Sequence, residues 1–227
     1  MTFMKFGERW NFYINCLHSL SIALVRYALM KKIVAELKAR DKRLGSIIDA
    51  YPLCTIGSAS PKSSNFEALV ETVISQQLAV KAADTIYSRL KEISGGKVTQ
   101  SSIAKLSENQ FRAVGVSGAK AKTIIGLTHS EINFSHLNKK SDEDIRHALT
   151  SLWGIGTWTV DMYMIFQLGR LDIWPVGDLG VRRGWEKIYR LADEISPLEL
   201  EKKGAKFSPY RSVVAWYCWR ALTPPTK

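Results

Sequence analysis

The stretch Leu152–Gly169, LWGIGTWTVDMYMIFQLG, decides the fold. One predicted helix ends in its first residues, the chain turns on Gly154 and Gly156, and a second, mainly apolar helix begins at once. The first amides of a helix have no intrahelical partner and carry the positive end of the helix dipole. Glycine lets an anion reach such amides, so the stretch predicts a helical hairpin that binds a single phosphate. The alternative is a hairpin in which the glycines serve only the turn.

The rest of the chain also predicts short helices with tight connections. The segment 66–90 carries apolar residues at helical spacing, is interrupted at residues 75–77, and follows Asn65 as its expected N-cap. Pro52 ends an earlier helical region, and the segment 101–115 reads as one further helix. No segment alternates polar and apolar residues as a half-buried strand does. We therefore expect an all-α fold.

The charge balance points to a polyanionic partner. The chain has 32 Lys and Arg against 21 Asp and Glu, a net charge of +11, which favours nucleic acid first and an anionic membrane second. The three cysteines, Cys16, Cys54 and Cys218, form no CxxC pair, which argues against a zinc or iron–sulfur framework. Such sparse cysteines suit a reducing compartment.

Residues 1–29 fit poorly with the rest of the chain. Their apolar run is interrupted by His18 and Arg26 and is too broken to span a bilayer. We interpret them as an N-terminal extension upstream of a natural start at Met30. A signal peptide, an organelle transit peptide and an added membrane-associating segment remain alternatives.

A second informative stretch is DIWPVGDLGVRRGW. Pro175 blocks a helix and Gly177 permits an unusual φ, so Asp178 is expected at a sharp turn just before a helix from Leu179. A helix N-terminus keeps a carboxylate ionised, which suits one that faces developing positive charge. The alternative is a plain N-cap aspartate.

Taken together, four segments in this order resemble the helix-hairpin-helix (HhH-GPD) DNA glycosylases: residues 66–90, the hairpin LWGIGTWTVD, the Asp178 turn, and SPYRSVVAWYCWRAL. The resemblance covers residues 66–222 and is strongest to the 3-methyladenine DNA glycosylase II branch (AlkA-like and yeast MAG-like enzymes). The twenty-residue step from Trp158 to Asp178 matches as well.

This resemblance implies two helical domains that flank a DNA-binding cleft. One is residues 66–169, a bundle that ends in the hairpin; the other combines residues 30–65 with 170–227. The implied reaction is hydrolysis of the N-glycosidic bond of 3-methyladenine and 7-methylguanine in duplex DNA, the first step of base excision repair.

By resemblance, Asp178 is the catalytic carboxylate, which stabilises the oxocarbenium-like sugar. Relatives that also cut the strand carry a lysine where this chain has Trp158, and no lysine occurs from Gly154 through Leu179. A monofunctional hydrolase without lyase activity is therefore expected. The iron–sulfur cysteines of endonuclease III and MutY relatives are absent from the sequence.

The remaining candidates come from the resemblance and from the neighbouring residues. Aromatic and apolar side chains are expected to hold the flipped, cationic base: Trp158, Trp219, Met162, Tyr163 and Trp216. The candidates for DNA contact are the hairpin residues Gly154, Gly156, Thr157 and Thr159, the wedge Gln76, Gln77 and Leu78, and the basic residues Lys120, Lys122, Arg182 and Arg183. Backbone carbonyls of Thr150, Leu152 and Ile155 are the candidate ligands of a structural Na⁺ or K⁺.

Several alternatives stay open at this point. Taken alone, SQQL (residues 75–78) favours a polar corner between helices, and only the resemblance favours a wedge. Trp216 and Tyr163 are aromatic residues at helical spacing, which more often belong to the core. Trp153 stands where the family often has proline, which leaves the turn less rigid. Met162 and Leu179 stand where some relatives have tyrosine, so the size of the pocket and its substrate range are not fixed. The enzyme could instead act on ethenylated, deaminated or oxidised bases, or the protein could bind lesions without catalysis. We expect a monomer without redox or organic cofactor, cytoplasmic (nucleoid) if bacterial and nuclear if eukaryotic.

Overall fold

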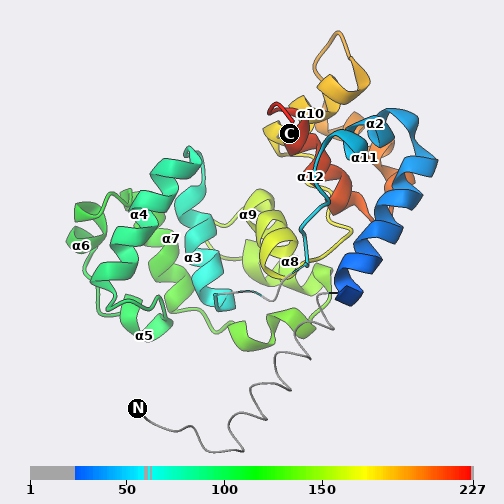
Figure 1. The fold of residues 1–227 in the computed structure, drawn as a ribbon. Helices are drawn as coiled ribbons and strands as arrows, with labels where there is room; N and C mark the ends of the chain where they lie inside the picture. The colour runs from blue at the N-terminus through cyan, green and yellow to red at the C-terminus, as the bar shows by residue number, and fades with distance from the viewer. Residues whose placement is uncertain (1–23, 59–60, 62, 226–227) are drawn as a thin grey trace, which may run out of the picture. The chain divides into compact units, whose positions relative to one another are not determined.

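The computed structural model describes residues 24–58, 61 and 63–225. These residues form helices and connecting loops, and none of them lies in a β-strand, as the sequence predicts (Figure 1). Cys16 and most of the predicted extension 1–29 lie outside this part of the chain. Among the helices of the described part, none is both long and apolar enough to cross a membrane.

The chain divides into two compact units. We call Met1–Ser60 together with Leu179–Lys227 the terminal unit, and Pro61–Asp178 the central unit. The sequence analysis places the second boundary after Gly169, whereas the central unit continues to Asp178.

The reason for the later boundary lies in the packing of the segment after the hairpin helix. Arg170 Nε lies 3.0 Å from Asp142 Oδ1, and Arg170 Nη2 donates to the Lys140 carbonyl at 2.8 Å. Both partners belong to the central unit. The segment from Arg170 onward is therefore tied to the bundle that precedes it.

In the terminal unit, α10 packs on α12 with the two backbones in close approach. A Cβ on Gly184 of α10 would lie 2.0 Å from the Cys218 carbonyl oxygen of α12, so only glycine permits this approach. Trp185 is buried there and stacks on Tyr189, with ring centroids 4.2 Å apart. The elements of this unit are a helix over residues 24–40, α2 (Lys42–Ala50), α10 (Leu179–Tyr189), α11 (Pro197–Gly204), the 3-10 helix η3 (Ala205–Phe207) and α12 (Arg211–Ala221).

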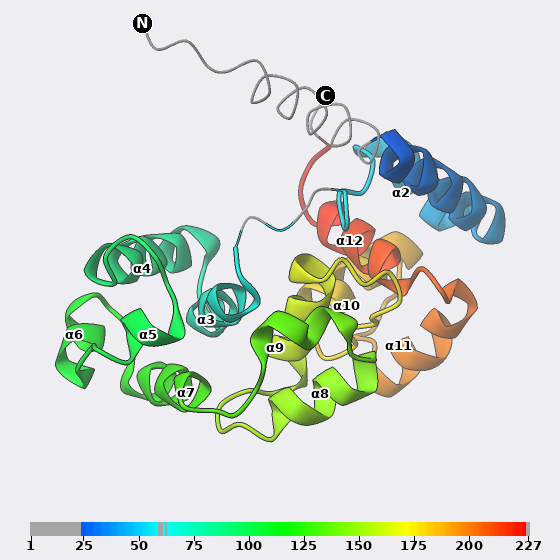
Figure 2. The same ribbon diagram turned by 90° about the horizontal axis from the view of Figure 1, so that it is seen from below.

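In the central unit, α3 is the helix around which the others pack. It contacts α4, α7, α9, η1 and η2, and Figure 2 shows it between α4, α7 and α9. Its apolar face, which includes Leu69, Val70 and Val73, is fully buried. The elements are α3 (Asn65–Ser75), α4 (Val80–Ile93), α5 (Gln100–Ile103), α6 (Glu108–Ala113), α7 (Gly118–Thr128), the 3-10 helix η1 (Phe134–Lys139), α8 (Asp142–Thr150), α9 (Thr157–Met162) and the π-helix η2 (Tyr163–Gln167).

Two local expectations are wrong. The N-cap of α3 is Ser64, whose hydroxyl accepts from the Glu67 amide at 3.1 Å, and Asn65 is the first helical residue. The segment 101–115 is not one helix, because Ser107 starts α6 with a reciprocal capping box to Gln110. The first difference is a one-residue shift of the cap, and the second is a break between α5 and α6; in both, a serine hydroxyl decides where the helix begins.

Candidate active site

The hairpin turn between α8 and α9 requires glycine at one of its two positions. The Ile155 amide donates to the Leu152 carbonyl at 3.2 Å, and Gly154 has φ +80°, as the third residue of a type II turn does. A Cβ on Gly154 would lie 2.0 Å from Thr123 Oγ1 of α7. Glycine is therefore required at position 154 both by the backbone conformation and by the packing against Thr123.

Gly156 has a different role. Its φ is −96°, which any residue can adopt, and no heavy atom lies within 4 Å of the position of its Cβ. It is the N-cap of α9 and supplies no side-chain cap to the first amides of that helix. The fold does not need glycine here, and the missing side chain leaves open space beside amides that attract an anion.

The hairpin is held rigidly by side chains from neighbouring helices. Thr159 is 2% exposed, and its hydroxyl accepts from Gln76 Nε2 at 2.8 Å. The same Gln76 amide group donates to the Gly154 carbonyl at 3.2 Å. Arg146 of α8 pairs with Asp161 of α9 at 2.7 Å. The Thr159 side chain is therefore used within the protein, and only the backbone amide of this residue stays a candidate for contact with phosphate.

Of the three predicted wedge residues, Gln77 and Leu78 are exposed and Gln76 is tied to the hairpin. Gln77 has φ +55°, an unfavourable conformation for a residue with a side chain. It stands between the end of α3 and the start of α4. The strained position presents Gln77 to solvent at a break between two helices.

The predicted basic contacts are used in different ways. Lys120 Nζ donates to the carbonyls of Ile74 and Gln76 at 2.8 and 2.7 Å, which caps the end of α3, and burial lowers its pKa. A phosphate contact by Lys120 would have to break these bonds. Lys122 is exposed, with Nζ 4.3 Å from the Trp153 ring centroid in a cation–π contact.

Arg182 and Arg183 lie on α10 in the terminal unit. Arg183 pairs with Glu186 at 3.0 Å and with Glu194. Arg182 Nε is buried and has no hydrogen-bond partner among the described residues. Their contact with phosphate stays a prediction.

Asp178 stands directly before α10, which begins at Leu179 as the sequence predicts. Its amide donates to the Pro175 carbonyl at 2.9 Å and closes the turn. Its Oδ2 accepts a hydrogen bond from Trp158 Nε1 at 2.7 Å. Such a charge-assisted bond is stronger than a neutral one and fixes the direction of the carboxylate. Trp158 and Asp178, twenty positions apart in sequence, are thus hydrogen-bonded to each other within the central unit.

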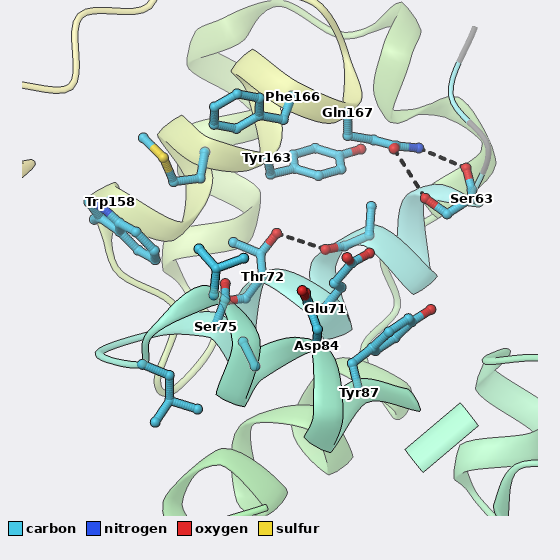
Figure 3. Close-up of a pocket in the computed structure, with 15 residues that line it drawn as sticks. Ser63, Glu71, Thr72, Ser75, Asp84, Tyr87, Trp158, Tyr163, Phe166 and Gln167 are labelled. Carbon is cyan, nitrogen blue, oxygen red and sulfur yellow. Dashed lines mark hydrogen bonds between the residues drawn. The ribbon is translucent and has the colours of Figure 1, made fainter. Parts of the chain in front are cut away.

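Trp158 also lines a cavity of about 480 Å³ in the central unit, a size in the range of ligand pockets (Figure 3). Of the predicted base-pocket residues, the structure brings Trp158, Met162 and Tyr163 together here. Trp216 and Trp219 lie on α12 in the terminal unit, and their part in a base pocket stays a prediction.

The cavity is also lined by residues that the sequence analysis did not predict. Phe166 and Gln167 reach it from the π-helix η2, whose extra residue per turn changes which side chains share a face. The opposite wall comes from α3 and α4, with Glu71 and Asp84 among its side chains. The residues of α3 and α4 lie far from the hairpin in sequence. For α3, the only sequence signal is the spacing of Ala68, Glu71, Thr72 and Ser75, which places them on one face of the helix.

Two of the three candidate cation ligands have carbonyl oxygens that can accept further contacts. Thr150 ends α8, so its carbonyl lies among the last four that a helix leaves without an intrahelical donor. The Leu152 carbonyl accepts one hydrogen bond, from the Ile155 amide, and keeps a second lone pair. Binding of Na⁺ or K⁺ by these carbonyls stays a prediction.

Comparison with known proteins identifies the class. Residues 70–209 match the family model described as HhH-GPD superfamily base excision DNA repair protein, and the chain belongs to this superfamily. It is 33% identical over 186 residues to DNA-3-methyladenine glycosylase 1 of Schizosaccharomyces pombe, an alignment that covers 79% of this chain and 80% of that relative.

Solved structures agree. The S. pombe 3-methyladenine DNA glycosylase in complex with abasic DNA superposes with a TM-score of 0.75 at 29% identity, over 86% of this chain and 99% of that one. A DNA-3-methyladenine glycosidase from Bacillus halodurans gives 0.72 at 32% identity, over 83% and 88%. The family, its 3-methyladenine branch and the all-α fold are thereby confirmed.

Proposed function

We propose that this protein is a monofunctional DNA glycosylase that hydrolyses the N-glycosidic bond of 3-methyladenine and 7-methylguanine in duplex DNA and so initiates base excision repair. The relatives named above support the reaction. The observation that supports it in this chain is the hydrogen bond from Trp158 to Asp178, which orients a carboxylate next to a residue that lines a cavity large enough for a purine.

The chemistry depends on that carboxylate. When the bond between C1′ and the base nitrogen breaks, the base leaves with the electron pair and the sugar becomes positively charged. Asp178 stabilises this charge and accepts a proton from the water that adds to C1′. An alkylated purine that already carries a positive charge leaves as a neutral base without being protonated first. Trp158 keeps Asp178 in place and, lacking an amine, forms no Schiff base with the sugar.

Binding uses the hairpin and the helix break. The amides at the start of α9, beside Gly156, hold a phosphate of the damaged strand, and Na⁺ or K⁺ on the carbonyls of Thr150, Leu152 and Ile155 would add positive charge there. Gln77, with Leu78 beside it, fills the gap that the flipped base leaves in the stack. The reaction needs no redox or organic cofactor.

The test compares wild type with Asp178→Asn on methylated duplex DNA. Wild type should release 3-methyladenine and 7-methylguanine, and the strand should stay intact until it is cut with hot alkali. Loss of one preorganised electrostatic contact of about 3–4 kcal/mol should slow Asp178→Asn by a factor of about 10²–10³, with DNA affinity kept. Asp193→Asn, at an exposed aspartate with no hydrogen bond or salt bridge to the described residues, is the matched control.

Two outcomes would change the proposal. If wild type and Asp178→Asn both bind DNA and neither releases a base, the protein is a lesion-binding protein without catalysis. If wild type releases only ethenylated, deaminated or oxidised bases, the reaction stands and the substrate class is wrong.

A further inference from the structure

The cavity beside Trp158 has a charge opposite to that of the chain. Its fifteen lining residues include two carboxylates, Glu71 and Asp84, and neither lysine nor arginine. The chain as a whole has a net charge of +11. Because lysine and arginine outnumber aspartate and glutamate in the sequence, a lining with two acidic residues and no basic one runs against the composition of the chain.

The two carboxylates face each other across the α3–α4 wall, as Figure 3 shows. One turn earlier on α3, Glu67 is satisfied by Lys91 at 3.0 Å and by the Tyr87 hydroxyl at 2.6 Å. Glu71 and Asp84 form no salt bridge or hydrogen bond within the described residues. Burial, with the charges of Glu67 and Asp84, raises the pKa of the Glu71 carboxyl. The charge of Lys91 opposes this shift in part, and both side chains are exposed to solvent, but no lysine or arginine of the described residues pairs directly with either carboxylate.

A second observation points to a ligand in the same cavity. Tyr163 is 1% exposed, lines the cavity, and its hydroxyl has no hydrogen-bond partner among the described residues. Figure 3 shows its ring across from Thr72 and its hydroxyl on the side of Gln167. A buried hydroxyl without a partner is costly, and a bound molecule with polar edges would satisfy it.

We propose that Glu71 and Asp84 form an acidic wall that selects positively charged bases, the N-alkylated purines, over neutral lesions of similar size. This inference rests on the proposed function, because it assigns the cavity to the flipped base. The partly exposed ring of Trp158 stacks on any purine, charged or neutral. Two carboxylates without a direct ion pair attract only the cation, so they add the discrimination that stacking alone provides weakly.

The first experiment measures binding without catalysis. Wild type and the double variant Glu71→Gln, Asp84→Asn are titrated near neutral pH with 7-methylguanosine, whose imidazolium ring is positively charged, and with guanosine, its neutral counterpart. Wild type should prefer 7-methylguanosine by about tenfold, equivalent to about 1.4 kcal/mol, and the double variant should show almost no preference. Glu92→Gln removes the same charge from α4 at an exposed position outside the cavity and should keep the preference.

The second experiment follows single-turnover release of 7-methylguanine and of hypoxanthine from matched duplexes. The double variant should release 7-methylguanine about tenfold more slowly and leave any hypoxanthine release unchanged. Equal slowing of both substrates, or a cation preference that survives in the double variant, overturns the acidic wall. Failure of wild type to release any base overturns the proposed function instead, and the nucleoside titration still decides whether the wall selects cations.

Discussion

The two glycines of the hairpin should respond to alanine in different ways, although each substitution adds a single methyl group. Gly154 has φ +80°, and a residue with a side chain in this left-handed region costs about 1–3 kcal/mol. Its new Cβ would also meet Thr123 Oγ1 at 2.0 Å. Gly156 has neither difficulty, since its φ is −96° and the space around its Cβ is open.

The clash at Gly154 cannot be removed by a simple rotation of Thr123. Rotation would break the hydrogen bond from its hydroxyl to the Ala119 carbonyl, worth about 1 kcal/mol, and would leave the new Cβ 3.0 Å from Thr123 Cβ. Together with the backbone term, Gly154→Ala should cost about 2–4 kcal/mol. For a chain of this size that lowers Tm by about 5–15 °C.

Gly156→Ala should keep stability within about 1 kcal/mol, the difference between glycine and alanine at an N-cap. It should instead weaken DNA binding by about tenfold, because the methyl group stands where the phosphate approaches the α9 amides. Thermal unfolding by circular dichroism and anisotropy with a duplex containing an abasic site measure the two effects separately. Equal loss of Tm in both variants would refute the structural reasoning, and full DNA affinity in Gly156→Ala would remove the phosphate from this end of α9.

Three further predictions concern other parts of the chain. Trp158→Phe keeps a ring but removes the N–H bonded to the Asp178 carboxylate, so single-turnover base release should fall by about 10–100-fold at unchanged DNA affinity, and a loss of affinity alone would contradict this role. Burial raises the pKa of Cys54 to about 12, and Cys218 is also buried, so neither thiol should be found labelled when the folded protein is treated with a thiol reagent and mapped by mass spectrometry, whereas both should react after unfolding. Burial disfavours the charge of Asp41, but hydrogen bonds, the one from Lys206 foremost, hold its pKa below the ordinary 3.8. The ionised carboxylate therefore stabilises the folded state at pH values above 3.8, and this stabilisation is lost as the pH falls through the pKa of the folded state. In Asp41→Asn, Tm should therefore fall less steeply with decreasing pH below about pH 4. If Tm falls as steeply as in wild type, this carboxylate contributes nothing to acid stability.

The hairpin and the aspartate were predictable because their signals are local. A turn with glycine at Gly154 and a helix start after Asp178 depend on a few consecutive residues. Ser141 is a signal of the same kind, since its hydroxyl accepts from the Asp144 amide at 3.1 Å and caps the start of α8. Conformational restrictions and caps act over one turn of chain, so sequence alone suffices for them.

The cavity could not be predicted in the same way, since its walls come from α3, α4, α9 and η2. Pairing of Glu71 with Asp84 depends on how two helices pack across a loop, not on spacing along one helix. Lys120 illustrates the same limit. It is basic and close to a small turn, which suggested a phosphate contact, yet it reaches across to α3 and caps two carbonyls.

Where the charges lie matters more for this function than how many there are. Basic residues attract DNA over distances comparable to the Debye length, about 8–10 Å in physiological salt, and the same residues inside the base cavity would repel a cationic purine. The chain avoids that conflict, because its lysines and arginines stay out of the cavity lining while Glu71 and Asp84 stand in it. A substitution that adds a positive charge there, such as Ser75→Lys, should leave DNA attraction intact or stronger and still reduce release of 7-methylguanine. If release of 7-methylguanine were instead unchanged, the flipped base would have to bind outside this cavity and approach Asp178 from another side.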